Sequence, residues 1–200
     1  NRFRILAIGP RIKTWVNDVP AADYLDFVDL SGHFGFQVHS GRCAVAWRNI
    51  SIADFGTRSW EPLLDAPIAF EDDAFFLEIE QPLTTATTAL QLSTTLTKGL
   101  LRIALSNSED TSAQAYAVQV PAPFSGTISI VCETAKTSVL INGVELSPGP
   151  PALGGPLKVS LSSPKGTSGT LGAINYLQPT EQERSLQGHS QDPGVPPSPH

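Results

Sequence analysis

The feature that most limits how this chain can fold is the alternation of apolar and polar side chains along most of its length. The stretch FGFQVHS is one example, since Phe34, Phe36 and Val38 alternate with Gln37 and His39. Because successive side chains of a strand point to opposite faces, this period predicts strands with one buried face. Long patterns of helical period are missing from the sequence. The chain is therefore predicted to be all-β, most simply an antiparallel sandwich.

The same alternation locates the expected strands. Threonine, serine and valine are frequent in them, as half-buried pleated surfaces prefer. Turn signals with tolerance for positive φ occur at Asn17-Asp18 and Asn142-Gly143. The expected strands are Phe3–Ile8, Arg11–Asn17, Phe34–Ser40, Cys43–Ile52, Ala74–Glu80, Leu100–Leu105, Ala115–Val120, Gly126–Glu133, Ser138–Ile141, Leu157–Leu161 and Thr170–Tyr176.

Composition excludes several kinds of partner. The net charge is -6, from 13 basic and 19 acidic residues, and no basic patch is present, so nucleic acid is not expected to bind. No apolar run is long enough to span a membrane. The chain begins at Asn1 without methionine, so a signal peptide, if one exists, is expected upstream, and the expected location is extracellular or periplasmic. Cys43 and Cys132 are expected to be small buried side chains, not zinc ligands or a disulfide.

An internal repeat organises the chain. RILAIGPRIKTWVNDVP, starting at Arg4, aligns with ISIVCETAKTSVLINGVEL, starting at Ile128. The stretch that begins at Phe34 has a weaker counterpart that begins at Leu157. The repeat predicts a first domain, residues 1–56, whose front half is missing, and a second, more nearly complete domain at residues 57–178. Residues 179–200 are rich in Pro, Gln and Ser and are predicted to be a disordered tail.

The first fifty-odd residues also resemble a known family. The matching motifs are RI-x-TWVN-x-V (Arg11–Val19), then Asp23-Tyr24 with Asp26, then GHFGFQVHSG, and the closing RNISI. This run is similar to the C-terminal half of the 3-keto-disaccharide hydrolases, also described as 3-keto-glucoside 1,2-lyases and 3-keto-2-hydroxyglucal hydratases. The resemblance implies a concanavalin-like or laminin-G-like jelly-roll in tandem copies, with the first truncated.

The second repeat departs from the family pattern. Where family members usually carry Tyr-Glu-Val-Gln, this chain has AYAVQV, with Ala117 in place of the glutamate. Ser160 and Ser162 stand at the positions of Gln37 and His39. These departures predict that the second repeat lacks chemistry of this type.

The resemblance implies a reaction and a site. A ketone at C3 of a sugar acidifies the proton on C2, and its removal expels the C1 substituent, after which water adds back. His39 is expected to be the base or a metal ligand, because imidazole titrates near neutral pH. Gln37 would orient the sugar. No cofactor is required by any motif, although a divalent metal is left open. The expected substrate-binding residues are Asp23 and Asp26 from the adjoining loop, together with Lys13, Trp15 and Asn17, which share one face of the expected strand Arg11–Asn17.

Other interpretations of these residues stay open. His39 is equally well a solvated surface histidine, and the aspartates are equally well turn formers. The chain alone is expected to be inactive on 3-keto-glucosides, since half of the first sandwich is missing. The leading alternative is a non-catalytic carbohydrate-binding or adhesion module that keeps the fold without the chemistry. In both interpretations the partner is a carbohydrate.

Overall fold

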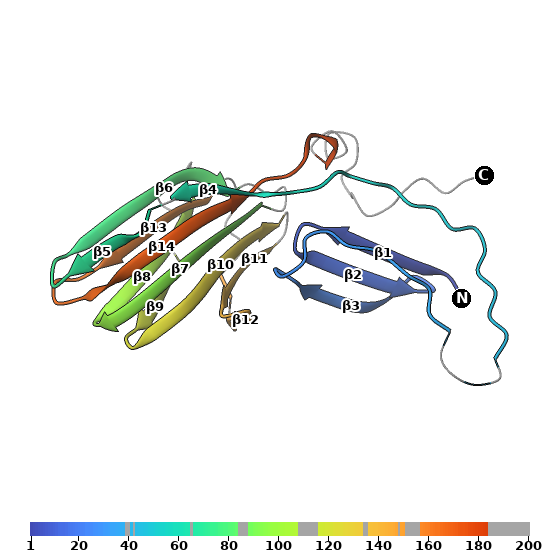
Figure 1. The fold of residues 1–200 in the computed structure, drawn as a ribbon, viewed down its shortest axis with the longest axis horizontal. Helices are drawn as coiled ribbons and strands as arrows, with labels where there is room; N and C mark the ends of the chain where they lie inside the picture. Colours follow the sequence, from blue (N-terminus) through green and yellow to red (C-terminus); the bar gives the residue numbers. More distant parts are fainter. Residues whose placement is uncertain are drawn as a thin grey trace. The chain divides into compact units, whose positions relative to one another are not determined.

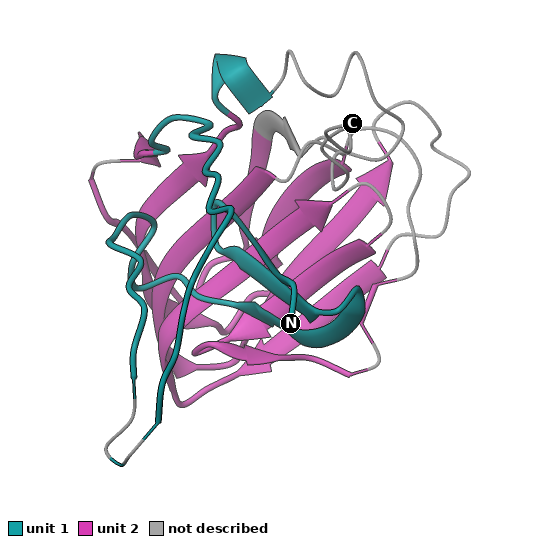
Figure 2. Ribbon diagram, turned by 90° about the vertical axis from the view of Figure 1, so that its right-hand side faces the viewer, with its two compact units in different colours: residues 1–58, 180–200 teal, residues 59–179 magenta. Residues whose placement is uncertain are grey.

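The computed structural model is built almost wholly of antiparallel strands, which confirms the predicted all-β fold class (Figure 1). It describes residues 1–38, 41, 43–64, 66–83, 88–107, 116–133, 136–147, 149–150 and 157–183. The chain divides into two compact units, coloured separately in Figure 2. Unit 1 contains residues 1–58 and 180–200, and unit 2 contains residues 59–179.

Unit 2 is a two-layer antiparallel sandwich. Its larger sheet has the order β12-β11-β10-β7-β14-β4, with β5 also paired to β14, and its smaller sheet has the order β6-β13-β8-β9. The strands are β4 (Trp60–Leu64), β5 (Ile68–Glu71), β6 (Phe75–Leu83), β7 (Thr88–Lys98), β8 (Leu100–Asn107), β9 (Tyr116–Pro121), β10 (Phe124–Glu133), β11 (Lys136–Ile141), β12 (Val144–Glu145), β13 (Leu157–Ser163) and β14 (Ser168–Leu177).

The hydrophobic core of the described residues lies entirely in unit 2. Alternate residues of both sheets point into it, as Leu90 and Leu92 do from β7 and Val159 and Leu161 do from β13. All four are fully buried. The two-residue period of the sequence therefore becomes an inward apolar face on each sheet, which is the usual way that a sandwich closes.

Unit 1 contains one described sheet, formed by β1 (Phe3–Ile8), β2 (Arg11–Val16) and β3 (Val19–Leu25). One face of this sheet remains open: Phe3, Ile5, Val19 and Tyr24 are 56%, 69%, 65% and 50% exposed. Unit 1 thus has a sheet of the expected amphipathic kind without a buried apolar core among its described residues.

Two predicted strands are not strands. Residues 34–38 and 43–52 form no regular ladder, and Phe34, Phe36 and Val38 are more than half exposed. Cys43 is exposed, contrary to expectation, whereas Cys132 is buried, and no disulfide joins them. The counterparts of these segments in unit 2 are β13 and β14, which pair with β6, β8, β7, β4 and β5. No described segment of unit 1 supplies such partners, and an extended segment without a partner strand has no ladder to join.

The two hairpins of the predicted repeat have the same pair of hydrogen bonds at their turns. In the first repeat, the Asn17 backbone N–H donates to the Arg2 carbonyl at 2.8 Å, and the Asn17 Oδ1 accepts from the Arg2 N–H at 2.8 Å. In the second repeat, Asn142 makes the same two bonds with Thr127, at 2.8 and 2.9 Å. Both asparagines have positive φ, 52° and 50°, in the tight turns that the sequence predicts. One asparagine thus closes each hairpin in the same way.

Candidate functional site

The two residues predicted to carry the chemistry are not brought together by a described strand. Gln37 is exposed in a segment without regular structure, and His39 lies outside the described residues. Nearby, the rings of Phe36 and Trp47 lie 4.6 Å apart between centroids, and Trp47 also contacts Phe3 at 6.1 Å. The aromatic side chains of this region therefore contact one another instead of an inter-sheet core, and the pairing of Gln37 with His39 stays a prediction.

Lys13 and Trp15 lie on one face of β2, as the alternation predicted. The register of the sheet places Arg4 opposite Trp15, and the Arg4 guanidinium carbon lies 3.9 Å from the centroid of the indole ring. This is the geometry of a cation–π contact. The ring therefore stacks with a residue of its own sheet, which leaves at most its other face for a sugar.

Asp23 also has a structural partner. Its Oδ1 lies 2.6 Å from the Arg11 Nε, and the Arg11 side chain is nearly buried while the Asp23 side chain is half exposed. Asp26 accepts a hydrogen bond from the Val28 N–H at 2.9 Å, the arrangement of an Asx turn. Both carboxylates thus have partners within unit 1. A role in sugar binding remains a prediction for each.

Asn17 is held by the hairpin described above, because its Oδ1 accepts from Arg2 and its Nδ2 donates to the Asn1 Oδ1 at 3.1 Å. Its side chain is therefore committed to the turn at both ends. Sequence reasoning grouped Asn17 with Lys13 and Trp15 on one strand face, but Asn17 is the first residue of the turn that follows the strand.

The second repeat offers a template for where the predicted residues would point. The register aligns Lys13 and Trp15 with Ser138 and Leu140 of β11, on the outer side of the larger sheet. Gln37 aligns with Ser160 of β13, on the outer side of the smaller sheet. In a sandwich the outer sides of the two sheets face away from each other. The template therefore gives no support to one site that combines Gln37 with Lys13 and Trp15.

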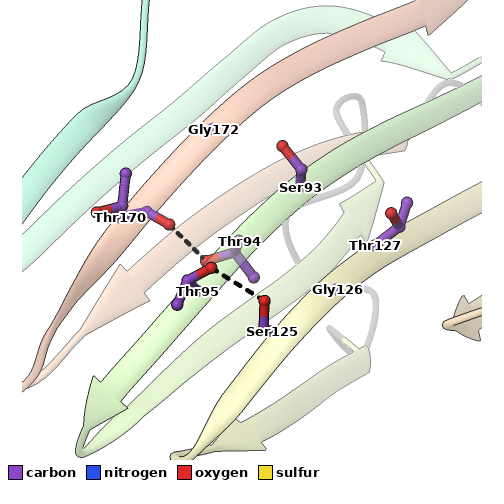
Figure 3. A pocket seen from close by; sticks show the side chains of 8 residues that line it. All are labelled: Ser93, Thr94, Thr95, Ser125, Gly126, Thr127, Thr170 and Gly172. Atoms are coloured by element: carbon purple, nitrogen blue, oxygen red, sulfur yellow. Dashed lines mark hydrogen bonds between the residues drawn. The ribbon is translucent and has the colours of Figure 1, made fainter.

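Unit 2 has a shallow hollow of about 270 Å³ on the outer face of its larger sheet (Figure 3). Three neighbouring strands, β7, β10 and β14, supply its lining, which contains hydroxyl side chains and glycine alone. Two hydrogen bonds order it: Thr94 Oγ1 donates to the Thr170 carbonyl at 3.1 Å, and the Thr95 and Ser125 hydroxyls lie 3.2 Å apart. The lining residues are Ser93, Thr94, Thr95, Ser125, Gly126, Thr127, Thr170 and Gly172.

Two glycines of this hollow lie close against neighbouring side chains. A Cβ at Gly172 would approach the Ser93 Oγ to 2.4 Å, and a Cβ at Gly126 would collide with the side-chain amide of Asn142. The hollow was not predicted, because β7 was not recognised as a strand. The signal was present in STTLT (residues 93–97), where alternate hydroxyl residues mark an outer face.

Two further features are absent from the described ranges. No group of three or more His, Cys, Asp or Glu side chains there is placed to hold a metal ion. Within the same ranges, no helix is both long and apolar enough to cross a membrane.

Fold and topology define unit 2 as an antiparallel β-sandwich. The family match lies in unit 1. Residues 1–53 match the family model described as a 3-keto-alpha-glucoside-1,2-lyase-like domain. The match confirms the resemblance over this segment, which is 53 of the 200 residues. No curated protein matches the chain.

The solved structures that resemble this chain in backbone include two of a transglycosylase. The apo Crh5 transglycosylase is 14% identical, with a TM-score of 0.37, and the alignment covers 64% of this chain and 82% of that chain. The Crh5 transglycosylase in complex with NAG is 12% identical, with a TM-score of 0.36, and the alignment covers 60% of this chain and 78% of that chain.

Proposed function

We propose that the protein is carbohydrate-active and that residues 1–53 contribute to a site of the 3-keto-glycoside lyase type. The observation that carries the proposal is the family match over these residues, which include the Gln-x-His pair. His39 takes the C2 proton of a 3-keto-glucoside, the electron pair forms the C1–C2 double bond, and the C1 substituent leaves with its bonding electrons. Water then adds across that bond to complete hydrolysis.

The side chains of this segment have separate roles in the proposed reaction. Imidazole accepts the proton because its pKa lies near neutral pH without strong perturbation. Gln37 donates a hydrogen bond from its amide to a sugar oxygen and so orients the ring. Lys13 is a proposed sugar contact. Trp15, Asp23 and Asp26 are proposed to contact the sugar in exchange for their present partners, which are Arg4, Arg11 and the Val28 N–H.

The test measures binding of methyl 3-keto-glucoside and of methyl glucoside to the whole chain by ligand-observed NMR. Preference for the ketone that is lost in His39→Ala and weakened in Gln37→Ala supports the proposal. His33→Ala is the matched control, since His33 is an exposed histidine of the same segment. Equal binding of the two sugars, or binding indifferent to His39→Ala, contradicts it.

Turnover provides a second measurement, with release of p-nitrophenolate from the p-nitrophenyl 3-keto-glucoside. The chain alone is expected to give none. Turnover that disappears in His39→Ala would refute that expectation while supporting the role of His39.

A second candidate function is sugar binding without chemistry, and the hollow of unit 2 favours it. Its lining is uncharged, and serine and threonine hydroxyls both donate and accept hydrogen bonds, as sugar hydroxyls require. A glycan array should then show binding that survives His39→Ala and falls in Thr95→Val. Thr97→Val is the control, because Thr97 lies on the same strand outside the hollow. Binding that instead fails in Trp15→Ala would place the sugar on unit 1.

A further inference from the structure

The smaller sheet of unit 2 has an outer face made of alternate residues of its four strands. Val159 and Leu161 are buried in the core, so the residues between and beside them on β13 lie on the outer face. The register of the sheet places ten residues on this face, which we call the polar face: Phe76, Glu78, Arg102, Ala104, Ser106, Ala117, Gln119, Lys158, Ser160 and Ser162. All ten are exposed or partly buried, so the polar face is open to solvent.

One row of the polar face crosses all four strands of the sheet. Register pairs Ser162 with Phe76 on β6 and with Arg102 on β8. It also pairs Arg102 with Gln119 on β9. Neighbouring strands lie about 4.8 Å apart, so the Cα atoms at the two ends of the row are roughly 14 Å apart. A ring that is 68% exposed, a hydroxyl, a guanidinium and an amide thus follow one another across the sheet.

The guanidinium in this row differs from the other basic side chains on the strands of unit 2. Three of those side chains form ion pairs of 2.5 to 2.8 Å, which are Lys98 with Asp72, Lys136 with Glu145 and Lys158 with Glu78. Arg102 is exposed and forms no ion pair with any described residue. Its cross-strand neighbours Ser162 and Gln119 are uncharged. The polar face therefore has one unmatched positive charge, although the chain as a whole has a net charge of -6.

We propose that the polar face binds an oligosaccharide that carries carboxylates, that is, an oligomer of uronic acids. The Arg102 guanidinium presents parallel N–H donors that match the two oxygens of a carboxylate. The Ser162 hydroxyl and the Gln119 amide, on either side of it, both donate and accept hydrogen bonds, as the ring hydroxyls of a sugar require. The choice of a sugar rests on the proposed carbohydrate activity, whereas the choice of a carboxylate rests on Arg102.

The exposed ring of Phe76 adds a second contact at one end of the row. It offers an apolar surface on which the C–H side of a pyranose ring can rest. Phe76 and Arg102 lie two strands apart, about 10 Å between Cα atoms, so a ligand that contacts both extends over more than one sugar ring. The hollow on the larger sheet has no charged residue in its lining. The two surfaces of unit 2 are therefore expected to differ in the charge of the sugar that they select.

The first experiment titrates the whole chain with tetragalacturonate, and with the same tetramer methyl-esterified on every carboxyl group, by isothermal titration calorimetry. The ester keeps the rings and hydroxyls but removes the charge, so the acid should bind about 10-fold more tightly or better. Arg102→Gln should abolish this preference, and Arg102→Lys should keep part of it, because lysine retains the charge without the planar fork. Lys136→Gln is the matched control, since it removes one positive charge from the larger sheet and should leave the preference unchanged.

The second experiment separates the contribution of the ring from that of the charge. Phe76→Ala should weaken the binding of acid and ester by a similar factor, because the ring contributes apolar contact alone. A tetraglutamate peptide tests an acid that is not a sugar, and it should bind about 10-fold more weakly than tetragalacturonate or worse. Far-UV circular dichroism shows whether each variant keeps its strands.

Four results would overturn the proposal: no binding of tetragalacturonate, equal binding of acid and ester, a preference for the acid that survives Arg102→Gln, or equal binding of the peptide. None of these measurements involves a 3-keto group or His39. The chain can therefore fail to prefer the ketone and still prefer the acid, or the reverse, so the two proposals are tested separately.

Discussion

The two units contain the same hairpin in different surroundings. The β1–β2 hairpin of unit 1 and the β10–β11 hairpin of unit 2 share register, turn geometry and the paired bonds of Asn17 and Asn142. In unit 2 Ile128 and Ile130 of the hairpin are fully buried, whereas their counterparts in unit 1, Phe3 and Ile5, are more than half exposed. Short-range sequence therefore determines the hairpin, while its burial depends on other strands that pack against it.

The few buried groups of unit 1 differ in kind from those of unit 2. Among its described residues only Pro10, Arg58 and Glu183 are buried. The Arg58 Nη2 lies 2.8 Å from the Glu183 Oε2, and the Arg58 Nε donates to the same carboxylate at 2.9 Å. Thr180 caps the short helical turn at 181–183, and Glu183 accepts from the Thr180 N–H at 2.7 Å, which is a capping box. The buried side chains of unit 1 thus include an ion pair, whereas those of the unit 2 core are mostly aliphatic.

The largest contrast is expected in thiol labelling. Cys43 in unit 1 is exposed and Cys132 in unit 2 is buried, so Cys132 should react on the order of 10,000-fold more slowly, after unfolding. Burial also raises the pKa of the Cys132 thiol, which reduces its reactive thiolate. The free energy of unfolding of unit 2 should therefore fall as the pH rises above about 8.5. At that pH the thiol ionises in the unfolded chain while the buried thiol of the folded chain stays protonated. Maleimide labelling, with the products identified by mass spectrometry, measures the labelling rate of Cys132 and its dependence on pH. Rapid labelling of Cys132 would show that unit 2 opens readily.

Removing the buried cation of unit 1 should have the next largest effect. Arg58→Ala leaves the Glu183 carboxylate buried without its guanidinium and should destabilise unit 1 by about 3–5 kcal/mol. Hydrogen exchange of the amides at 180 and 183 measures the loss. The double variant Arg58→Ala with Glu183→Ala should recover part of it; no recovery would mean that Arg58 acts through packing, for example against Gly9.

A core substitution tests the difference in burial directly. Leu92→Ala in the central strand of the larger sheet should lower the free energy of unfolding of unit 2 by about 3 kcal/mol. Ile5→Ala should cost about 0.5 kcal/mol or less because Ile5 is exposed. Urea titration followed by far-UV circular dichroism gives the first value, and hydrogen exchange of β1 gives the second. Similar costs at both positions would remove the contrast.

A smaller effect than that of Leu92→Ala is expected at the shared turn. Asn142→Ala removes the bond to the Thr127 N–H and places alanine at positive φ, so it should cost unit 2 about 1–2 kcal/mol. Asn17→Ala should accelerate hydrogen exchange in the β1–β2 hairpin without changing the unfolding of unit 2. If Asn17→Ala did destabilise unit 2, the units would not unfold independently.

Sequence alone predicted most strands and few features of the site. The residues of β1 were predicted without error, since Phe3–Ile8 alternates cleanly and is bounded by Gly9 and Pro10. The central strand β7 was missed although Leu90, Leu92 and Leu96 alternate with polar residues. Segments 34–40 and 43–52 carry equally good alternation, but period reports what a strand would bury and not whether a partner strand is present.

The candidate site was harder to predict for the same reason. Alternation correctly placed Lys13 and Trp15 on one face, yet the stacking of Arg4 on Trp15 and the pairing of Arg11 with Asp23 come from neighbouring strands whose register a single sequence does not reveal. Whether His39 and Gln37 meet any of these residues depends on sheet assignment, which alternation leaves open.

The contact of Arg58 with Glu183 has a practical consequence for dissecting the molecule. Arg58 ends the first stretch of unit 1 and Thr180 begins its second, and Thr180 donates to the Phe55 carbonyl at 2.5 Å. The segment between them, residues 59–179, therefore connects to unit 1 at two positions that lie close together. A short glycine-serine tether could thus replace the whole sandwich, and the excised segment could be prepared separately with its ends already near each other.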